Sequence, residues 1–176
     1  MLLSMLPCPI WPQQKIGGPN RIETPEAFVQ EFYNWYVSIA LNDNAGPAWN
    51  SALKSRKCAF NPELFRALKE DSDAQAKASD LVGLDFDPFL NSQDPCESYQ
   101  VGSSTQKGSE YQVDVYANCS GKKTDVPSVV AVLVCKGGKW RFMNFEYPDG
   151  GDLLSNLRVL RDDRRKSHGS KPKAAN

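Results

Sequence analysis

The sequence predicts an α+β domain in which helices come first, an antiparallel sheet of about four strands follows, and one helix ends the fold. Before about residue 80, apolar side chains recur at the 3.6-residue period of a helix. After Tyr99 they alternate with period two, as in half-buried strands. Between the two parts, Leu84–Cys96 combines apolar anchors, acids and two prolines, and it cannot form a regular helix. This segment should join the helical half to the sheet.

The length of 176 residues suits a single domain with one core. Residues 1–23 are predicted to be a leader or irregular N-terminal segment, because prolines and glycines punctuate its second half. The domain should span 24–165, followed by a disordered basic tail at 166–176. The apolar start is similar to a truncated signal peptide, although it lacks a basic region and a cleavage site. We therefore expect a periplasmic or secreted protein, and a cytoplasmic one is the alternative.

Helix start signals occur twice in the first half. Thr24-Pro25-Glu26 offers a capping hydroxyl, a proline in the first turn and an acid near the positive end of the helix dipole. Asn61-Pro62-Glu63 repeats the signal for a helix that we expect to fade near Asp71, and a shorter helix through Trp49 should lie between them. The first helix carries a mostly aromatic stripe, which predicts a core face or a pocket wall. Its members are Phe28, Phe32, Trp35, Tyr36 and Ile39.

Gly137-Gly138 predicts a two-residue hairpin turn between two apolar strands. Pairing across this turn places Leu133 opposite Phe142 on one face of the sheet. The other face is then predicted to pair Val130 and Val132 with Phe145 and Met143. Because both faces are apolar, we expect helices on one side and a further layer or a second subunit on the other, such as a homodimer through the sheet.

The C-terminal part predicts an amphipathic helix followed by basic residues. Asp152 can cap a helix with Leu153, Leu154, Leu157 and Leu160 on one side. We interpret the basic run as a solvated helix face with a disordered tail, and electrostatic docking to a partner is the alternative. The run consists of Arg158, Arg161, Arg164, Arg165, Lys166, Lys171 and Lys173.

The five cysteines predict one disulfide, between Cys96 and Cys119. A two-residue hairpin loop at 107–108 would bring them opposite each other, closing a loop worth about 3 kcal/mol and indicating an oxidising compartment. The same register turns Tyr99 and Val101 away from the core valines of the next strand. A shift by one residue would bring them together, and a bulge between 102 and 108 would reconcile both observations. The remaining Cys58 and Cys135 are expected to be buried small hydrophobes.

Residue types exclude several function classes. The formal charge is zero, with 21 basic and 21 acidic residues, so no overall field favours nucleic acid. No stretch approaches the roughly 20 apolar residues of a transmembrane span. His168 is the one histidine and no Cys-x-x-Cys pair occurs, so we expect neither a metal site nor a histidine-activated nucleophile. A glycine-rich phosphate loop is also missing, and no cofactor is predicted.

Carboxylate and tyrosine chemistry remains open. An acid and a tyrosine could act as general base and hydrogen-bond donor in an apolar cavity. The acids are Asp85, Asp87 and Asp94, and the tyrosines are Tyr33, Tyr36, Tyr99 and Tyr116. The structural alternative is that Asp87, directly before Pro88, accepts backbone N–H bonds in a turn while Phe89 plugs the core. Gln93 and Asp94 would then fix the path into the first strand.

Three motifs together resemble a known family. They are Phe28-x-x-x-Phe32-Tyr33-x-x-Tyr36, then Asp87-Pro88-Phe89 with Gln93-Asp94, then Trp140-x-Phe142-x-Asn144-x-x-Tyr147-Pro148 before a leucine-rich helix. Over about 24–165 the chain looks like the bacterial domain-of-unknown-function family 3828, within the NTF2-like superfamily. The resemblance implies a cone, a curved antiparallel sheet around helices with a cavity at its open end. It also implies exported or envelope-associated relatives, and it supplies no catalytic residues.

The candidate pocket or motif residues are Tyr33, Tyr36, Asp85, Asp87, Phe89, Gln93, Asp94, Trp140 and Asn144. Our leading hypothesis is a non-catalytic envelope or secreted accessory protein that binds a protein partner or a small apolar ligand through the cone. One alternative is a small enzyme that uses an Asp/Tyr pair in an apolar cavity. The other is a toxin-immunity-type protein, which blocks a toxin by surface complementarity.

Overall fold

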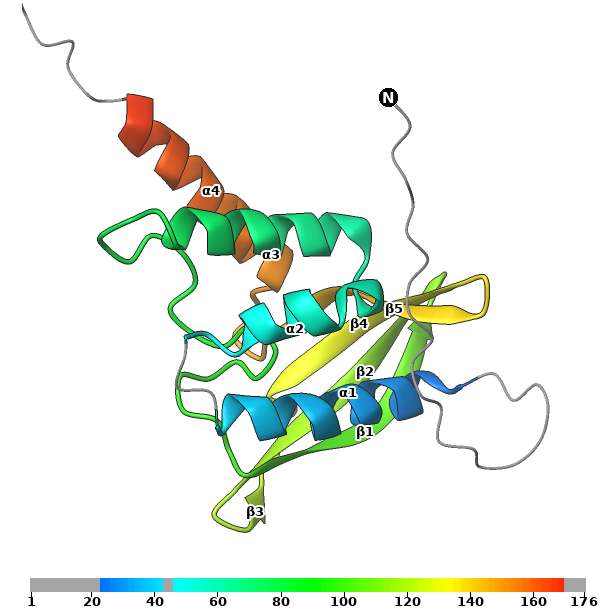
Figure 1. Cartoon of the computed structure of the whole chain (residues 1–176). Coiled ribbons are helices and arrows are strands. Elements are labelled where there is room, and N and C mark those ends of the chain that lie inside the picture. Colours follow the sequence, from blue (N-terminus) through cyan, green and yellow to red (C-terminus); the bar gives the residue numbers. More distant parts are fainter. Residues whose placement is uncertain (1–22, 43–45, 170–176) are drawn as a thin grey trace, which may run out of the picture.

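The computed structural model describes residues 23–42 and 46–169, and it confirms an α+β fold with a curved antiparallel sheet and a C-terminal helix (Figure 1). In chain order the elements are helix α1 (Pro25–Ala40), helix α2 (Trp49–Ser55), the 3-10 helix η1 (Lys57–Ala59), helix α3 (Pro62–Gln75), strands β1 (Ser98–Lys107), β2 (Glu110–Cys119), β3 (Lys122–Lys123), β4 (Val129–Lys136) and β5 (Lys139–Glu146), and helix α4 (Leu153–Gly169). Because α4 extends to Gly169, the first part of the predicted tail is helical. The rest of the tail and nearly all of the predicted leader lie outside the described residues.

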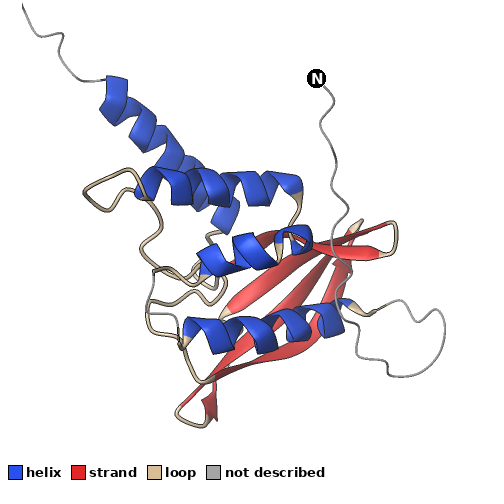
Figure 2. Ribbon diagram, viewed as in Figure 1, coloured by secondary structure: helices blue, strands red, loops and turns tan. Residues whose placement is uncertain are grey.

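Helices cover one face of the sheet. The strand order is β1-β2-β4-β5, and the short β3 pairs with the end of β2. Helix α1 packs on β1 and β2, α3 contacts β5 and α4, and α4 also reaches β5. Figure 2 shows α1, α2 and α3 on the same side of the sheet. Within the described residues no helix covers the opposite face, so the further layer that the sequence predicted is not formed by this part of the chain.

Local capping explains where the first and third helices begin. The Thr24 hydroxyl accepts a hydrogen bond from the backbone N–H of Ala27 at the start of α1. The Asn61 side chain caps α3 in the same way. The third helix does not fade at Asp71, as the sequence predicted, but continues to Gln75. It continues because the Asp71 side chain points inward, is fully buried and finds hydrogen-bond partners there.

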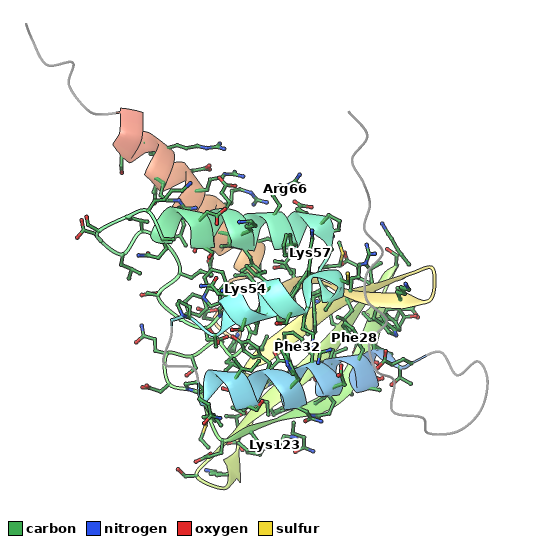
Figure 3. The ribbon with its side chains drawn as sticks, in the orientation of Figure 1. Phe28, Phe32, Lys54, Lys57, Arg66 and Lys123 are labelled. Atoms are coloured by element: carbon green, nitrogen blue, oxygen red, sulfur yellow. A yellow bond between two sulfur atoms is a disulfide. The ribbon has the colours of Figure 1, made fainter. Side chains whose placement is uncertain are left out.

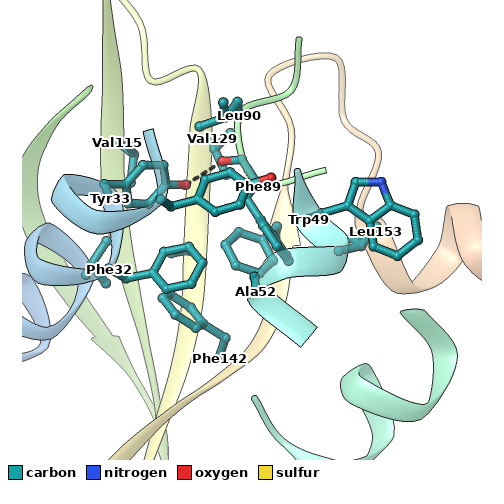
Figure 4. Packing of buried hydrophobic residues seen from close by; sticks show 14 of the residues in the cluster. Phe32, Tyr33, Trp49, Ala52, Phe89, Leu90, Val115, Val129, Phe142 and Leu153 are labelled. Carbon is teal, nitrogen blue, oxygen red and sulfur yellow. Dashed lines mark hydrogen bonds between the residues drawn. The ribbon is translucent and has the colours of Figure 1, made fainter. Parts of the chain in front are cut away.

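Aromatic rings fill the space between the sheet and the helices (Figure 4). Phe32 of α1 lies at the centre, stacked on Tyr36 at 5.5 Å between ring centroids and edge-on to Phe89 at 5.6 Å. On the sheet side, Phe142 is 4.8 Å from Phe32 and 5.0 Å from Phe145. All five side chains are at most 1% exposed. The aromatic stripe of α1 is therefore a core face rather than a pocket wall.

The β1–β2 hairpin differs in its turn from the sequence prediction. Its loop is 108–109 rather than 107–108, and a bulge lies between Val101 and Ser104. A bulge adds one residue to one strand and so reverses which side chains face the core beyond it. Tyr99 and Val101 consequently pack on the core. The shifted register, offered as an alternative from the sequence, is the correct one.

Cys96 and Cys119 form the predicted disulfide, with their Cα atoms 4.8 Å apart. The bridge connects the segment before β1 to the last residue of β2 and closes the open end of this hairpin. The prediction that the other two cysteines are buried small hydrophobes is wrong for Cys58 and holds in part for Cys135, which packs against the core. Cys135 is a free but only half-buried thiol, because it lies beside the exposed β4–β5 turn. Cys58 is half-buried and is itself disulfide-bonded.

The β4–β5 hairpin turns at Gly137-Gly138, as predicted, and pairs Leu133 with Phe142. Beyond this pair an irregularity shifts the register, and Met143 has no partner on β4. The predicted pairs of Val132 with Met143 and of Val130 with Phe145 are therefore wrong. The extra residue turns Phe145 toward the core, where it lies opposite Ala131 and is completely buried.

On the open face of the sheet, polar side chains shield the valines of β4. Val132 and Val134 are only 4% and 8% exposed, although they are outside the main core cluster. Gln112 of β2 donates from Nε2 to the carboxylate of Glu146 on β5, at 2.8 and 3.0 Å, so that this pair spans β4. Long polar side chains can cover apolar surface with their stems. Burial of these valines thus requires no second layer.

One side chain of α1 closes part of the free edge of β1. Gln30 donates from Nε2 to the carbonyl oxygen of Tyr99 at 3.2 Å and accepts at Oε1 from the N–H of Val101 at 3.0 Å. The side-chain amide therefore takes the place of a neighbouring strand, and a strand edge without such cover invites pairing with other chains.

We expect Gln30→Ala to lower the free energy of unfolding by about 1–2 kcal/mol, because one backbone N–H and one C=O lose their partners. Urea unfolding followed by tryptophan fluorescence measures the change. Gln30→Glu keeps the acceptor for Val101 but sets a carboxylate oxygen against the carbonyl oxygen of Tyr99, so it should be destabilising as well. If the alanine variant is as stable as the wild type, the Gln30 amide does not stabilise the edge of β1.

Candidate functional site

The only sequence-predicted acid that meets a tyrosine is Asp87, at the centre of the segment between α3 and β1. Its Oδ2 accepts a short hydrogen bond from the hydroxyl of Tyr36 on α1. Its Oδ1 accepts from the backbone N–H groups of Phe89 at 2.9 Å and Leu90 at 3.2 Å. Its own N–H donates to the carbonyl oxygen of Ser92 at 2.8 Å, closing a compact loop. The aspartate thus holds a turn and joins it to α1.

Burial changes the protonation of this carboxyl group. Asp87 is partly exposed as a residue, but its carboxylate is enclosed, and this burial raises its pKa to about 6. The hydrogen bonds from Tyr36, Phe89 and Leu90 act in the opposite direction, because they stabilise the charged form. Desolvation is the larger effect, so the folded protein favours the protonated acid more than the unfolded chain does.

Two further tyrosines hold the same segment. The hydroxyl of Tyr33 donates to the carbonyl oxygen of Phe89 at 2.6 Å, the contact drawn as a dashed line in Figure 4. The hydroxyl of Tyr147 donates to the carbonyl oxygen of Pro88 at 3.0 Å. Burial, together with the nearby charge of Asp87, raises the pKa of both phenols above its ordinary value. Both therefore remain neutral donors, and with Tyr36 they attach the segment to α1 and to the end of the sheet.

The remaining predicted site residues do not join this cluster. Asp85, Gln93 and Asp94 are exposed. The Gln93 amide donates to the backbone oxygen of Asp85 at 3.1 Å, and Asp94 exchanges backbone hydrogen bonds with the Ser92 hydroxyl. These contacts order the loop before β1, which fits the structural interpretation.

Trp140 and Asn144 of β5 also lie elsewhere. The indole N–H of Trp140 donates to the backbone oxygen of Glu23 at 2.6 Å, so it fixes the start of the described chain. Asn144 donates to Asp152 at 2.7 Å and accepts from the N–H of Leu154 at 3.1 Å, so it positions the start of α4. The nine candidate residues therefore form one tyrosine–aspartate cluster and several separate structural contacts.

The geometry of Asp87 suits support of the fold better than proton transfer. Both carboxylate oxygens are occupied by internal donors, and the carboxyl group is buried. A general base needs an acceptor lone pair within reach of a substrate proton. Among residues 23–42 and 46–169, no three acidic, histidine or cysteine side chains gather as metal ligands, and no helix is long and apolar enough to cross a membrane.

Two surface hollows lie along α3, away from Asp87. The larger one, of about 760 Å³, extends from α3 to the loop after it and includes Arg66, Lys69, Glu70, Asp73, Lys77 and Val82. The smaller one, of about 120 Å³, lies between α3 and α4. Its charged residues are Glu63, Arg66, Glu70, Arg158, Arg161 and Arg164. Arg66 and Glu70 belong to both, so the two hollows adjoin. We call the smaller one the α3–α4 trough.

The sequence interpretation missed a buried ion pair beneath these hollows. Nη1 of Arg164 lies 2.6 Å from Oδ1 of Asp71, with side-chain exposures of 14% and 1%. Oδ2 of Asp71 accepts from the N–H of Leu84 at 2.9 Å, and Nη1 of Arg164 also donates to the carbonyl oxygen of Val82 at 2.9 Å. A Cβ atom at Gly83 would lie 2.6 Å from Oδ2 of Asp71, so the loop approaches the carboxylate closely.

A signal for this pair was present in the sequence. Asp71 continues the apolar spacing of Leu64 and Leu68 on α3, and Arg164 continues that of Leu157 and Leu160 on α4. A charge on the apolar side of each of two neighbouring helices favours a buried partner. Arg164 was instead assigned to a solvated face, an assignment that this contact overturns.

The pKa of Asp87 predicts a pH dependence of stability. Its folded pKa, about 6, lies above the ordinary value of 3.8. The contribution of this group is therefore greatest below about pH 4 and is lost as the pH rises through 6, a change of about 3 kcal/mol. Asp87→Asn keeps an acceptor for the turn and removes the titration. We expect the free energy of unfolding of the wild type, relative to the variant, to fall between pH 4 and pH 7.

Urea titrations at several pH values measure that difference, and subtraction of the variant removes the titration of all other groups. A difference between wild type and Asp87→Asn that stays constant across this range would contradict a raised pKa at Asp87.

The comparison with solved structures finds chains of an effector–immunity complex. One chain of the crystal structure of the type VI native effector–immunity complex Tae3–Tai3 from Ralstonia pickettii gives a TM-score of 0.50 at 19% identity, covering 72% of this chain and 96% of that chain. A chain of the selenomethionine form of this complex gives a TM-score of 0.44 at 21% identity, with coverages of 71% and 97%. No family model and no curated protein matches the sequence, and the resemblance to family 3828 stays a prediction. At these identities the likeness concerns the fold alone.

Proposed function

We propose that this protein is a non-catalytic bacterial binding protein that recognises another protein, and that the partner is a toxin which it holds inactive by covering its surface. The observation that carries the proposal is the shared fold with a chain of the Tae3–Tai3 complex, of which 96% is matched. A fold by itself does not determine function, so the partner class is the part that needs a test.

The interior of the protein supports binding through the surface. Aromatic side chains occupy the space between the sheet and α1, where a cone-shaped fold would hold a small ligand. The two hollows found in the described residues lie on the surface along α3, and charged side chains line them. A protein that inhibits a toxin by covering its surface acts through shape and charge complementarity. Such inhibition requires an ordered surface and no catalytic group.

The disulfide supports a location outside the cytoplasm. Cys96 and Cys119 are bridged, and such bridges persist mainly in oxidising compartments such as the bacterial periplasm. We therefore propose a periplasmic or secreted protein. Thiol-blocked protein isolated from its host should contain this bridge by mass spectrometry, and free thiols at both positions would place it in the cytoplasm instead.

The partner class is tested in the native host. Tagged full-length protein is captured from periplasmic extract, and each captured protein is then produced alone and together with this chain. We expect one partner that stops growth when it is exported by itself and that is harmless when this chain is co-expressed. Partners that are never toxic, or toxicity that this chain does not relieve, would refute the immunity role. Capture alone would not establish it.

A second candidate is a small enzyme, which the raised pKa of Asp87 beside Tyr36 favours. If it is correct, Asp87→Asn abolishes turnover of an apolar carbonyl substrate while circular dichroism and the unfolding midpoint stay unchanged. Unfolding of that variant assigns Asp87 to the structure. A homodimer through the open sheet face also stays a proposal, and sedimentation at several concentrations tests it.

A further inference from the structure

The α3–α4 trough combines arginines with apolar side chains. Leu154 and Leu157 of α4 and Ala67 of α3 belong to its lining, together with Arg66 of α3 and Arg158 of α4. Arg66 and Arg158 are exposed. Figure 3 shows Arg66 on the side of α3 that points away from the sheet. Arginine next to apolar side chains is common in protein–protein contacts.

The cations of the trough differ in whether they have carboxylate partners. Arg164 is bound to Asp71, and Nε of Arg161 lies 3.2 Å from Asp162. Within the described residues, neither Arg66 nor Arg158 has a carboxylate within ion-pair distance, although Glu63 and Glu70 lie in the same lining. Two guanidinium groups therefore remain able to bind an incoming acid.

The size of the α3–α4 trough favours single side chains over a small-molecule ligand. Its volume of about 120 Å³ is well below the roughly 300–1,000 Å³ of small-molecule sites, but it accommodates one or two side chains. The chain has no net positive charge, so no overall field attracts a nucleic-acid backbone. Planar guanidinium groups bind carboxylates in a bidentate manner.

We infer that the α3–α4 trough is the docking site for an acidic segment of the protein partner, with Arg66 and Arg158 binding its carboxylates and Leu154 contacting its aliphatic carbons. This inference rests on the proposed function for the identity of the partner, but not for the chemistry of the site. Glu70 lies beside Arg66 and competes with the incoming acid.

A fluorescein-labelled oligoglutamate peptide serves as the probe, with binding to the full chain measured by fluorescence anisotropy at low ionic strength. We expect Arg66→Glu/Arg158→Glu to weaken binding about tenfold, because two attractions are replaced by two repulsions. Glu70→Gln should strengthen binding, since it removes a competing carboxylate. Salt should weaken the wild-type complex, as the charges are exposed.

The matched control is Lys122→Glu/Lys123→Glu, which changes the net charge by the same amount on the short β3 hairpin. Both lysines are exposed, and Figure 3 places Lys123 at the opposite end of the molecule from Arg66. The control should bind like the wild type. Circular dichroism verifies folding, and Arg66→Gln/Arg158→Gln replaces the charge reversal if that variant unfolds.

Three results would overturn the inference: no binding of the probe by the wild type, an equal loss in the control, or weaker binding by Glu70→Gln. Because the assay needs no natural partner, it can fail while the immunity role succeeds. In that event the same variants, tested against the captured toxin, would bind normally and show that the toxin occupies another face.

Discussion

Asp71→Ala is expected to lower the free energy of unfolding by about 3–5 kcal/mol. The substitution leaves the guanidinium of Arg164 without its carboxylate in a largely shielded position, and breaking a buried pair from one side is strongly destabilising. The N–H of Leu84 loses its acceptor as well. Urea unfolding, followed by circular dichroism, measures the effect as a lower midpoint with an unchanged slope.

Two sets of variants separate the ion pair from other effects. Asp73→Ala lies on the same helix, but its partner Lys69 is exposed, so the midpoint should hardly change. Arg164→Met should be destabilising alone, whereas Asp71→Leu/Arg164→Met should recover part of the loss, because neither charge is then left buried. Additive losses in the double variant would show that the two side chains do not act as a pair.

Phe89→Ala is expected to lower the free energy of unfolding by a similar amount, about 3–5 kcal/mol. The substitution opens a cavity where residues 84–96, the linking segment between α3 and β1, enter the core. The Phe89 ring is completely buried and lies 5.0 to 5.6 Å from four other rings, those of Phe32, Tyr36, Phe60 and Phe145. Its backbone anchors the turn of Asp87 and accepts from Tyr33. Loss of the ring should therefore loosen α1, the linking segment and β5 together.

Thermal unfolding by circular dichroism checks this prediction. Phe89→Leu should lose less, since most of the volume is retained. Phe86→Ala, in the same segment but only half-buried against Tyr147, is the matched control and should shift the melting temperature less. A small effect at Phe89 together with a large one at Phe86 would mean that the segment is held from its surface side.

The function of the linking segment follows from these contacts. Asp87 and Tyr36 contain the groups that a carboxylate enzyme would need, yet the hydrogen bond between them attaches the segment to α1. The Asp71–Arg164 pair then attaches the same segment to α3 and α4. These attachments give the α3–α4 trough a fixed geometry, which a docking surface needs if binding is not to cost ordering entropy.

The sequence predicted the elements that local chemistry controls. Capping residues and helical spacing located α1, α2 and α3, Gly137-Gly138 located a turn, and Asp152 located the start of α4. Each of these signals acts within a few residues of itself, so it does not depend on the rest of the fold. The disulfide between Cys96 and Cys119 was also predicted, although from a hairpin loop misplaced by one residue.

The sequence suggested a bulge in β1 without fixing its position, and it did not indicate the irregularity between β4 and β5. Whether β1 carries its extra residue at Gly102 or later depends on which placement turns Tyr99 toward α1, and Phe145 reaches the core only because Met143 is left unpaired. The backbone hydrogen bonds of two strands are nearly as favourable in one register as in the neighbouring one. The packing of side chains from other elements therefore selects the register.

The sequence by itself thus determined where the helices begin, which half holds the sheet and that Cys96 and Cys119 meet. Only the tertiary structure decided that Asp87 is enclosed by tyrosines and has its pKa raised, and that Asp71 and Arg164 find each other across 93 positions of the chain. The physical reason is that these interactions act over different separations along the chain. Caps and turns act between neighbours, whereas desolvation and ion pairing depend on every element that excludes water around a group.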